Sequence, residues 1–177
     1  ITQDLAGIKT KAQASSTYFA SSTAFGYDFV VATSGIYSVY RVTAVTPPPG
    51  GCTNTSNESG WGTWSIQSEV LVATGTIPAN ANFFFEDDLW VRGQIQGHKF
   101  TVAAGRFPDN PATRANITVN QDLRYTYYDG TDGIGLIEQN NFHVGLYSND
   151  VLRIDGALVA QNGRVGRYYY SPPNNQS

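Results

Sequence analysis

Short apolar segments recur at a spacing of about 17 residues through the second half of the sequence. Phe83, Phe100, Ile117 and Ile134 begin four of them, and each is followed two places later by another apolar residue. Alternate residues of a strand point to the same side, so each segment predicts a short strand with two inward side chains. A fixed period of this kind is typical of a coiled chain in which each turn covers the next. We therefore expect a mainly β fold, a β-helix or solenoid with about 17 residues per rung.

The pattern extends to the end of the sequence with one irregularity. At Val151 the register slips, and Leu152 and Ile154 make the better inward pair, which predicts a bulge or an altered corner. A second apolar series begins at Leu89, Leu123 and Ala157, at twice the basic interval, so each rung is expected to have at least two faces. Asp-Gly, Asn-Asn and Asn-Gly pairs between the strands suit tight corners. An antiparallel sandwich uses the same turn residues and remains the alternative.

Four regions follow from the pattern along the chain. Residues 1–45 are expected to form a short amphipathic helix within 2–20 and then a β-hairpin, whose strands 27–32 and 36–45 are joined by Thr33-Ser34-Gly35. The polar stretch 46–62, rich in Pro, Gly, Asn and Ser, predicts an exposed loop. The solenoid is assigned to 63–171, with a strand at 66–77 leading into it, and 172–177 is expected to be a polar tail.

Composition favours an exported β protein. Charged residues make up only 14%, and Gly, Tyr, Ser, Thr and Asn are frequent, which suits strands and polar turns. The net charge of -3 and the scattered cations give no basic stripe, so nucleic acid is not an expected partner. The absence of Met indicates that an N-terminal piece was removed, and membrane contact is expected only through such a missing segment. The single cysteine, Cys52, has no partner in the chain and is expected to be incidental.

Carboxylates are the first candidates for chemistry, because coiled β proteins often bind or cleave polysaccharides. A glycosidase needs two carboxylates about 5 to 10 Å apart. Glu138 and Asp155 are separated by one period of the repeat and form one candidate pair on successive rungs. Solvated corner carboxylates explain this spacing better than a catalytic pair does, and we expect no catalysis.

Metal binding has one candidate segment. Asp129-Gly-Thr-Asp132-Gly places two hard oxygen donors, Asp129 and Asp132, on a tight loop that could hold calcium. The segment lacks the alternating acids and the final Glu of an EF-hand, and Asp-Gly is first of all a turn signature. No cofactor is expected, and calcium at these two residues is the one alternative to that expectation.

Clustered aromatic residues are the expected binding surface. Consecutive strand residues point to opposite faces, so some rings of each cluster must lie outside. Exposed rings suit sugar stacking, protein docking or subunit assembly. The candidate binding residues are Tyr127, Tyr128, Tyr168, Tyr169 and Tyr170.

Several segments resemble one family. The five segments are Trp90-Val-Arg-Gly-Gln-Ile-Gln-Gly, Phe100-Thr-Val-Ala-Ala-Gly, Ile117-Thr-Val-Asn-Gln-Asp-Leu-Arg-Tyr, Ile134-Gly-Leu-Ile-Glu-Gln-Asn-Asn and Leu152-Arg-Ile-Asp-Gly-Ala-Leu-Val-Ala-Gln-Asn-Gly. Over the region from position 70 to position 170, the chain is similar to largely uncharacterised bacterial surface proteins related to minor-pilin-type components of type IV pilus systems. The resemblance implies export, a β-rich extracellular body and an upstream membrane helix, and it offers no catalytic residues.

These observations lead to one functional expectation and two alternatives. We expect a non-enzymatic protein of the bacterial cell surface, structural or adhesive and associated with pili. Its partners are expected to be other surface or pilus subunits, further copies of itself, or a glycan. The alternatives are a β-helix enzyme that cleaves polysaccharide and a self-assembling extracellular filament subunit.

Overall fold

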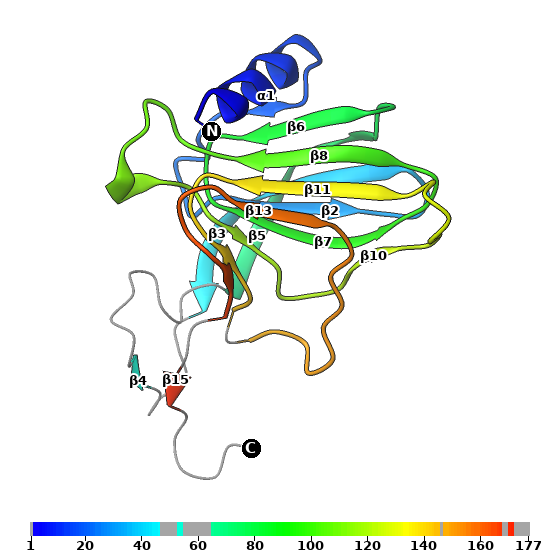
Figure 1. Cartoon of the computed structure of the whole chain (residues 1–177). Helices are drawn as coiled ribbons and strands as arrows, with labels where there is room; N and C mark the ends of the chain where they lie inside the picture. The colour runs from blue at the N-terminus through cyan, green and yellow to red at the C-terminus, as the bar shows by residue number, and fades with distance from the viewer. Residues whose placement is uncertain (1, 47–52, 55–64, 146, 168–169, 172–177) are drawn as a thin grey trace.

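The computed structural model describes residues 2–46, 53–54, 65–145, 147–167 and 170–171 (Figure 1). The described part is mainly β, with one α-helix and one short 3-10 helix. The helical elements are α1 (Thr2–Ala14) and η1 (Pro111–Thr113). The strands are β1 (Tyr18–Phe19), β2 (Tyr27–Val31), β3 (Ile36–Thr46), β4 (Thr53–Asn54), β5 (Ser65–Thr76), β6 (Ala81–Phe85), β7 (Leu89–Ile95), β8 (Lys99–Ala104), β9 (Ile117–Thr118), β10 (Leu123–Tyr125), β11 (Gly133–Glu138), β12 (Phe142–His143), β13 (Ala157–Ala160), β14 (Val165–Gly166) and β15 (Tyr170–Ser171).

Most of these strands belong to two sheets. The first, here called the parallel sheet, has the order β1-β6-β8-β11-β13, and every neighbouring pair in it is parallel. The second, the mixed sheet, has the order β14-β12-β9-β7-β2-β3-β5, with β10 also paired to β7. It is parallel from β14 to β2 and antiparallel at β2–β3 and β3–β5. Figure 1 shows the strands of the parallel sheet lying in front of those of the mixed sheet. The many parallel pairs argue against the antiparallel sandwich.

From β6 to β14 the chain passes repeatedly between the two sheets, with β9 and β10 as consecutive strands of the mixed sheet, and this builds the core. Phe83, Val102 and Leu136 point inward from the parallel sheet and are fully buried. Leu89 and Ile117 point inward from the mixed sheet into the same apolar cluster. Burying a large apolar side chain contributes roughly 1.5–3 kcal/mol, so this interior supplies the main stabilisation.

The expected period of the rungs does not match the spacing of paired strands. Phe100 pairs with Ile134, two sequence periods further on, whereas Phe83 pairs with Val102, slightly more than one period further on. Ile117, one period after Phe100, lies in the other sheet. The predicted rung length is therefore wrong. The alternation of inward and outward side chains within a strand depends only on local geometry. The number of residues from one strand to the strand paired with it also depends on the corners between them, which differ in length.

The irregularity expected at Val151 is present. Val151 is 87% exposed, whereas Leu152 and Ile154 pack against the core cluster. Ile154 forms an isolated parallel bridge with Leu123, which continues the mixed sheet without a full strand.

The N-terminal elements are a helix and a hairpin, as expected, but the helix is shorter than the 2–20 window. It ends at Ala14, shortly before Ser16, whose φ is 57°. Leu5 and Ala12 cover Phe84 on the outer face of the parallel sheet, so α1 lies against that face (Figure 1).

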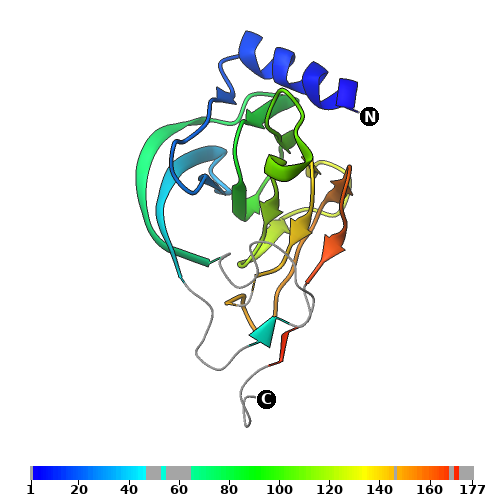
Figure 2. The same ribbon diagram turned by 90° about the vertical axis from the view of Figure 1, so that its left-hand side faces the viewer.

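The hairpin joins the rest of the sheet. β2 pairs with β3 on one side and with β7 on the other, so one sheet crosses the predicted boundary at residue 45. β5 covers the expected strand at 66–77. Figure 2 shows β3 and β5 bending away from the parallel strands, and three register shifts between them account for the bend. The tail 172–177, Cys52 and most of the loop 46–62 lie outside the described residues.

Candidate binding groove

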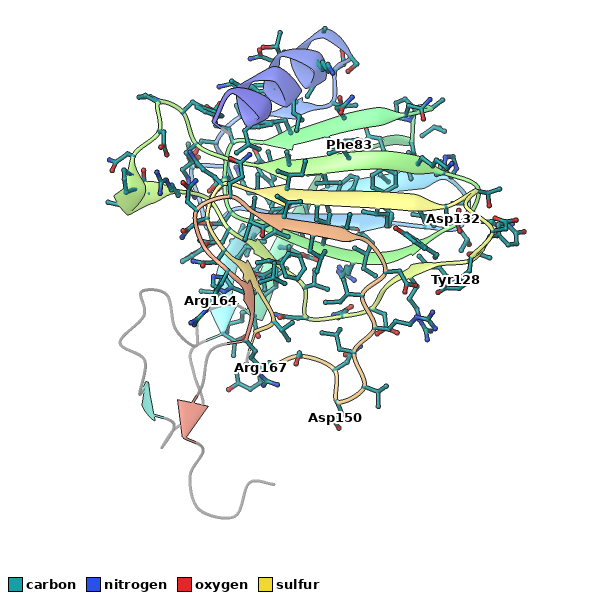
Figure 3. The ribbon with its side chains drawn as sticks, viewed as in Figure 1. Phe83, Tyr128, Asp132, Asp150, Arg164 and Arg167 are labelled. Carbon is teal, nitrogen blue, oxygen red and sulfur yellow. The ribbon has the colours of Figure 1, made fainter. Side chains whose placement is uncertain are left out.

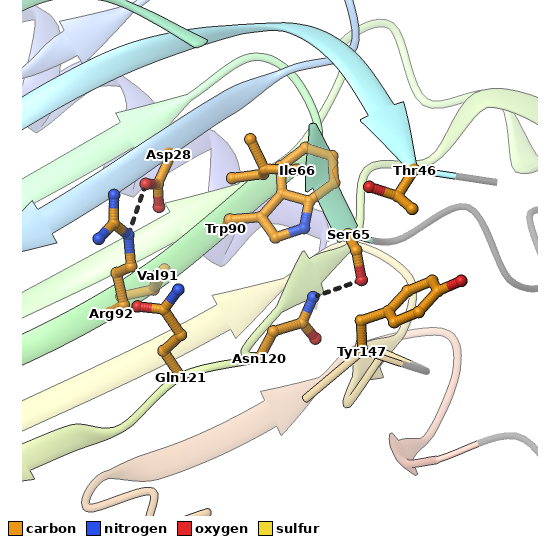
Figure 4. Close-up of a pocket in the computed structure, with 10 residues that line it drawn as sticks. All are labelled: Asp28, Thr46, Ser65, Ile66, Trp90, Val91, Arg92, Asn120, Gln121 and Tyr147. Atoms are coloured by element: carbon orange, nitrogen blue, oxygen red, sulfur yellow. Dashed lines mark hydrogen bonds and ion pairs between the residues drawn. The ribbon is translucent and has the colours of Figure 1, made fainter. Parts of the chain in front are cut away.

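Two adjoining cavities lie on the outer face of the mixed sheet. Their volumes are about 290 Å³ and about 350 Å³, and both are lined by Arg92 and Gln121. We call the two together the groove, and Figure 4 shows the first of them. Its lining residues are Asp28, Val30, Thr46, Ser65, Ile66, Trp90, Val91, Arg92, Gly93, Gln94, Asn120, Gln121, Asp122, Arg124, Tyr147 and Asn149.

The floor of the groove follows from the alternation of β7. Leu89, Val91 and Ile95 point into the core, so Trp90, Arg92 and Gln94 must point outward. Trp90 and Gln94 are four positions apart, which is about 13 Å at the usual rise of a strand. The floor therefore carries an indole, of which only an edge is exposed, then a guanidinium and an amide, in a row long enough for an extended ligand.

Polar side chains hold the walls together. Asn120, which follows β9, accepts a hydrogen bond from the Gly145 backbone N–H at 2.7 Å. Its Nδ2 also donates to Ser65 Oγ, at the start of β5, at 3.5 Å. The dashed line in Figure 4 marks this second contact. Asn120 thus links two walls that come from segments far apart in the sequence.

The guanidinium of Arg92, in the floor of the groove, forms ion pairs with two carboxylates. Arg92 Nε lies 2.8 Å from Asp28 Oδ2, and Arg92 Nη2 lies 3.1 Å from Glu69 Oε1. The Asp28 side chain has no exposed surface. Asp28 Oδ1 and Glu69 Oε2 are both buried without a hydrogen-bond partner. We call Asp28, Arg92 and Glu69 the Arg92 triad.

Burial changes the acidity of the triad. Loss of hydration raises the pKa of Asp28 to about 7, and the nearby Glu69 also raises it, although Arg92 acts in the opposite direction. Asp28 therefore exchanges a proton near neutral pH, and a protonated carboxyl can donate to a carboxylate beside it.

A row of buried side chains runs from Trp90 across the neighbouring strands β9 and β12. Register pairing places Trp90 beside Thr118 and Thr118 beside His143, and all three are buried. Burial lowers the pKa of His143 to about 4, so this histidine is neutral at pH 7.

The predicted aromatic surface is at a corner shown in Figure 3, and neither of its described tyrosines lines the groove. Tyr127 and Tyr128 are 43% and 62% exposed. Tyr128 Oη donates to Asp155 Oδ2 at 2.6 Å and accepts from Arg153, whose guanidinium lies 4.9 Å from the centre of the ring. Both rings are accessible, and that of Tyr128 is held in place. Tyr168 and Tyr169 lie outside the described residues, and only the backbone of Tyr170, in β15, is described.

The two predicted metal ligands have different surroundings. Asp132 is 6% exposed, and its carboxylate accepts hydrogen bonds from the backbone N–H groups of Gly97, His98, Thr126 and Tyr127. Asp129 is exposed and accepts from Thr131 N and Oγ1. Both Asp132 oxygens are used in fixing the corner. Within the described residues, no group of three or more His, Cys, Asp and Glu side chains is placed to hold a metal ion.

Glu138 and Asp155 do not lie opposite each other on neighbouring strands. Glu138 is at the end of β11, where it pairs with Ala160, a position beyond Asp155 in the chain. Its side chain is fully buried without a partner for either oxygen, and burial raises its pKa to about 9. Asp155 instead accepts hydrogen bonds from Tyr125 N and Tyr128 Oη at another corner. The pair does not form the carboxylate arrangement of a glycosidase.

The groove was not found by sequence reasoning. The alternation Trp90-x-Arg92-x-Gln94 on one side of an expected strand was an available signal, as was the acid in Tyr27-Asp28-Phe29. Both signals require knowing which strands stand next to each other, because Asp28 and Arg92 are far apart in the sequence.

Comparisons with known proteins found no matching family model, no matching curated protein and no matching solved structure. No helix within the described ranges is long and apolar enough to cross a membrane.

Proposed function

We propose that this chain is a β-solenoid binding module of the bacterial cell surface, and that the groove binds an extended polar ligand, an oligosaccharide. The solenoid is supported by the repeated passage of the chain between two sheets and by the parallel pairing within each. The observation that carries the function is the row Trp90, Arg92 and Gln94 along a groove walled by amides and hydroxyls.

The groove has the chemistry that sugars require. Saccharides present apolar ring faces and many hydroxyls, which match an aromatic ring and groups that both donate and accept hydrogen bonds. Gln94, Asn120 and Gln121 provide amides, and Trp90 and Tyr147 provide rings. A few convergent polar groups in a preformed recess are typical of a ligand site.

In this proposal the protein binds the oligosaccharide and does not cleave it. The candidate acid pair, Glu138 and Asp155, is divided between the core and a corner network. The exported location and the association with pili rest on the resemblance to minor-pilin-type surface proteins and on the composition. A surface protein whose groove binds an oligosaccharide would act as an adhesin, and this is the basis of the adhesive role.

The test is a glycan-array screen followed by isothermal titration calorimetry of the best oligosaccharide. The double change Gln94→Ala and Gln121→Ala removes two groove amides without touching the core. We expect it to weaken binding at least about tenfold, since each lost hydrogen bond contributes about 1 kcal/mol.

Gln13→Ala is the matched control, because Gln13 is exposed on α1, which lies against the other sheet. Equal loss of binding in the control and the groove variant contradicts the assignment, as does the absence of any bound glycan.

A filament subunit is the second candidate. Within the described part of the chain, β13 pairs only with β11 and β14 only with β12, so both sheets end in an open parallel edge. Val159 and Val165 on these edges are 46% and 48% exposed. Open edges with apolar side chains favour the addition of further strands. Ordered polymers in light scattering and negative-stain microscopy would support this role, and a monomer at high concentration would exclude it.

A further inference from the structure

Two arginine side chains border the second cavity of the groove, which has a volume of about 350 Å³. Arg92 comes from β7, and Arg124 comes from β10, which is paired with β7. Their side chains are 32% and 45% exposed, whereas Asp28 has no exposed surface and Glu69 is 22% exposed. A ligand in this cavity therefore meets the two guanidinium groups more readily than the two acids paired with Arg92.

Arg124 differs from other arginines of the chain in its partners. Four other arginine side chains each donate a hydrogen bond to a carboxylate, namely those of Arg92, Arg106, Arg114 and Arg153. Within the described ranges the Arg124 side chain donates no hydrogen bond, and the acid beside it, Asp122, has its Oδ2 3.4 Å from Arg124 Nε. The terminal nitrogens Nη1 and Nη2 of Arg124 are thus free to bind a ligand.

The free end of Arg124 suits a carboxylate. Asp122 lies on the Nε side of the guanidinium, and its Oδ1 accepts a hydrogen bond from the Arg153 backbone N–H at 2.9 Å. The backbone therefore holds Asp122 at a corner, where it leaves the terminal nitrogens open. A guanidinium binds a planar carboxylate through two parallel N–H···O bonds, and such charge-assisted bonds are about twice as strong as neutral ones.

Amide groups lie beside Arg124 where the rest of a sugar ring would sit. Gln94 is the register partner of Arg124, and its Nε2 donates to Thr126 Oγ1 at 3.0 Å, which leaves its Oε1 as an acceptor. Gln121 is exposed, and its amide makes no hydrogen bond within the described part of the chain. Both residues line the same cavity as Arg124 and can bind hydroxyl groups.

We propose that the groove selects acidic oligosaccharides, and that Arg124 binds the carboxylate of a uronic acid through Nη1 and Nη2. The inference rests on the proposed oligosaccharide function and specifies the class of sugar. A neutral sugar forms only neutral acceptors for this guanidinium, whereas a uronate adds a charge-assisted contact in an accessible cavity.

The charges around the cavity allow a carboxylate to bind. Burial raises the pKa of Asp28 to about 7, so at pH 6 this acid is mostly protonated and the Arg92 triad has no net charge. Asp122 is the remaining acid that lines the cavity, and it opposes a bound carboxylate. Its removal should therefore strengthen the binding of a uronate.

The experiment uses calorimetry at pH 6 with the tetramers of galacturonate, mannuronate and guluronate, each compared with its own methyl ester. The ester keeps the sugar and removes only the charge. We expect at least one uronate tetramer to bind at least about tenfold more tightly than its ester, as a charge-assisted contact allows.

Three variants assign the preference to Arg124. Arg124→Gln should lower the affinity for the uronate to about that of the ester, and Arg124→Lys, which keeps the charge but loses the paired donors, should restore only part of it. Asp122→Asn keeps an acceptor for the Arg153 N–H and should strengthen uronate binding at least about twofold.

Arg41→Gln is the matched control, because Arg41 is an exposed arginine of β3 that does not line the groove. It changes the net charge by the same amount as Arg124→Gln and should keep the preference. Loss of the preference in both variants would assign it to the overall charge of the protein and overturn the inference.

The outcomes separate this inference from the proposed function. If neutral glycans bind and no uronate binds more tightly than its ester, acid selection is overturned and the oligosaccharide groove stands. An undiminished preference in Arg124→Gln likewise overturns the inference. Failure of all the tetramers and of the glycan screen overturns the proposed function together with it.

Discussion

Arg92 Nε lies 2.8 Å from Asp28 Oδ2, although these residues come from strands far apart in the sequence and the Asp28 side chain has no exposed surface. Removing the cation leaves a buried acid uncompensated. We expect Arg92→Met to lower the free energy of unfolding by about 3 kcal/mol at pH 8. At pH 5 the loss should be smaller, because Asp28 is then protonated. Urea unfolding at both pH values measures the difference.

Arg153→Met is the control for that measurement. Arg153 also contacts an aspartate, Asp155, but it does so at an exposed corner, and such pairs contribute little. The same loss for the two arginine variants would show that burial of Asp28 is not the cause.

The buried Glu138 makes the fold more stable at low pH. Burial raises its folded-state pKa to about 9, above the ordinary 4.5, so the folded protein holds this proton more tightly than the unfolded chain. Its contribution is therefore complete below pH 4.5 and declines as the pH rises to 9. Glu138→Met should raise the free energy of unfolding by about 3 kcal/mol at pH 7 and hardly change it at pH 4. A flat difference between pH 4 and pH 8 would contradict this assignment.

Local sequence patterns predicted the strands well and their partners poorly. The triplets at Phe100 and Ile134 do form paired strands, because inward alternation is a property of each segment. The number of residues between paired strands could not be predicted, because the corners differ in length. The loop between β8 and β9, which contains η1, is one example. The sequence indicated which residue types form the corners. It did not indicate the hydrogen bonds between successive corners, in which Asn116 donates to Asp88 and accepts from Asn141.

The candidate site was harder to predict than the fold. Asp28 occurs in an apolar strand and Arg92 in another, and only the β2–β7 register brings them together. The exposed Tyr128 could be predicted from local sequence, since neighbouring tyrosines in a polar segment cannot all be buried. The buried state of Asp132 could not, because its four donors include Gly97 and His98, which come from a distant part of the sequence.

Gly93 tests the pairing of β7 with β2. Its φ is +122°, and a Cβ there would lie 2.0 Å from the Val31 carbonyl oxygen. Gly93→Ala should lower the free energy of unfolding by at least about 2 kcal/mol, because the backbone of one strand must move. Gly97→Ala is the matched control, since Gly97 has a φ of +71° with nothing within 4 Å and should cost only about 1 kcal/mol. Similar losses in thermal unfolding would contradict the close approach of the strands.

Asp132 tests whether the Asp129–Asp132 loop is a structural corner or a calcium site. Asp132→Ala removes the acceptor of four backbone N–H groups, so it should cost about 3 kcal/mol and speed hydrogen exchange at Gly97, Thr126 and Tyr127. Calcium should leave the melting temperature of the unaltered protein unchanged, because both Asp132 oxygens already have donors. A calcium-dependent rise that disappears in Asp129→Asn would instead establish the metal site.

Tyr127 and Tyr128 test whether the corner adds to adhesion. Exposed rings support little of the fold, so Tyr127→Ala and Tyr128→Ala should leave the melting temperature nearly unchanged. If the corner contacts a surface ligand, the double variant should lose cell or glycan adhesion while the groove still binds a soluble oligosaccharide. Tyr128→Phe separates the ring from its hydroxyl, which donates to Asp155, and should keep adhesion if the ring stacks on the ligand. Full adhesion by the double alanine variant would exclude the Tyr127–Tyr128 corner as a site of ligand contact.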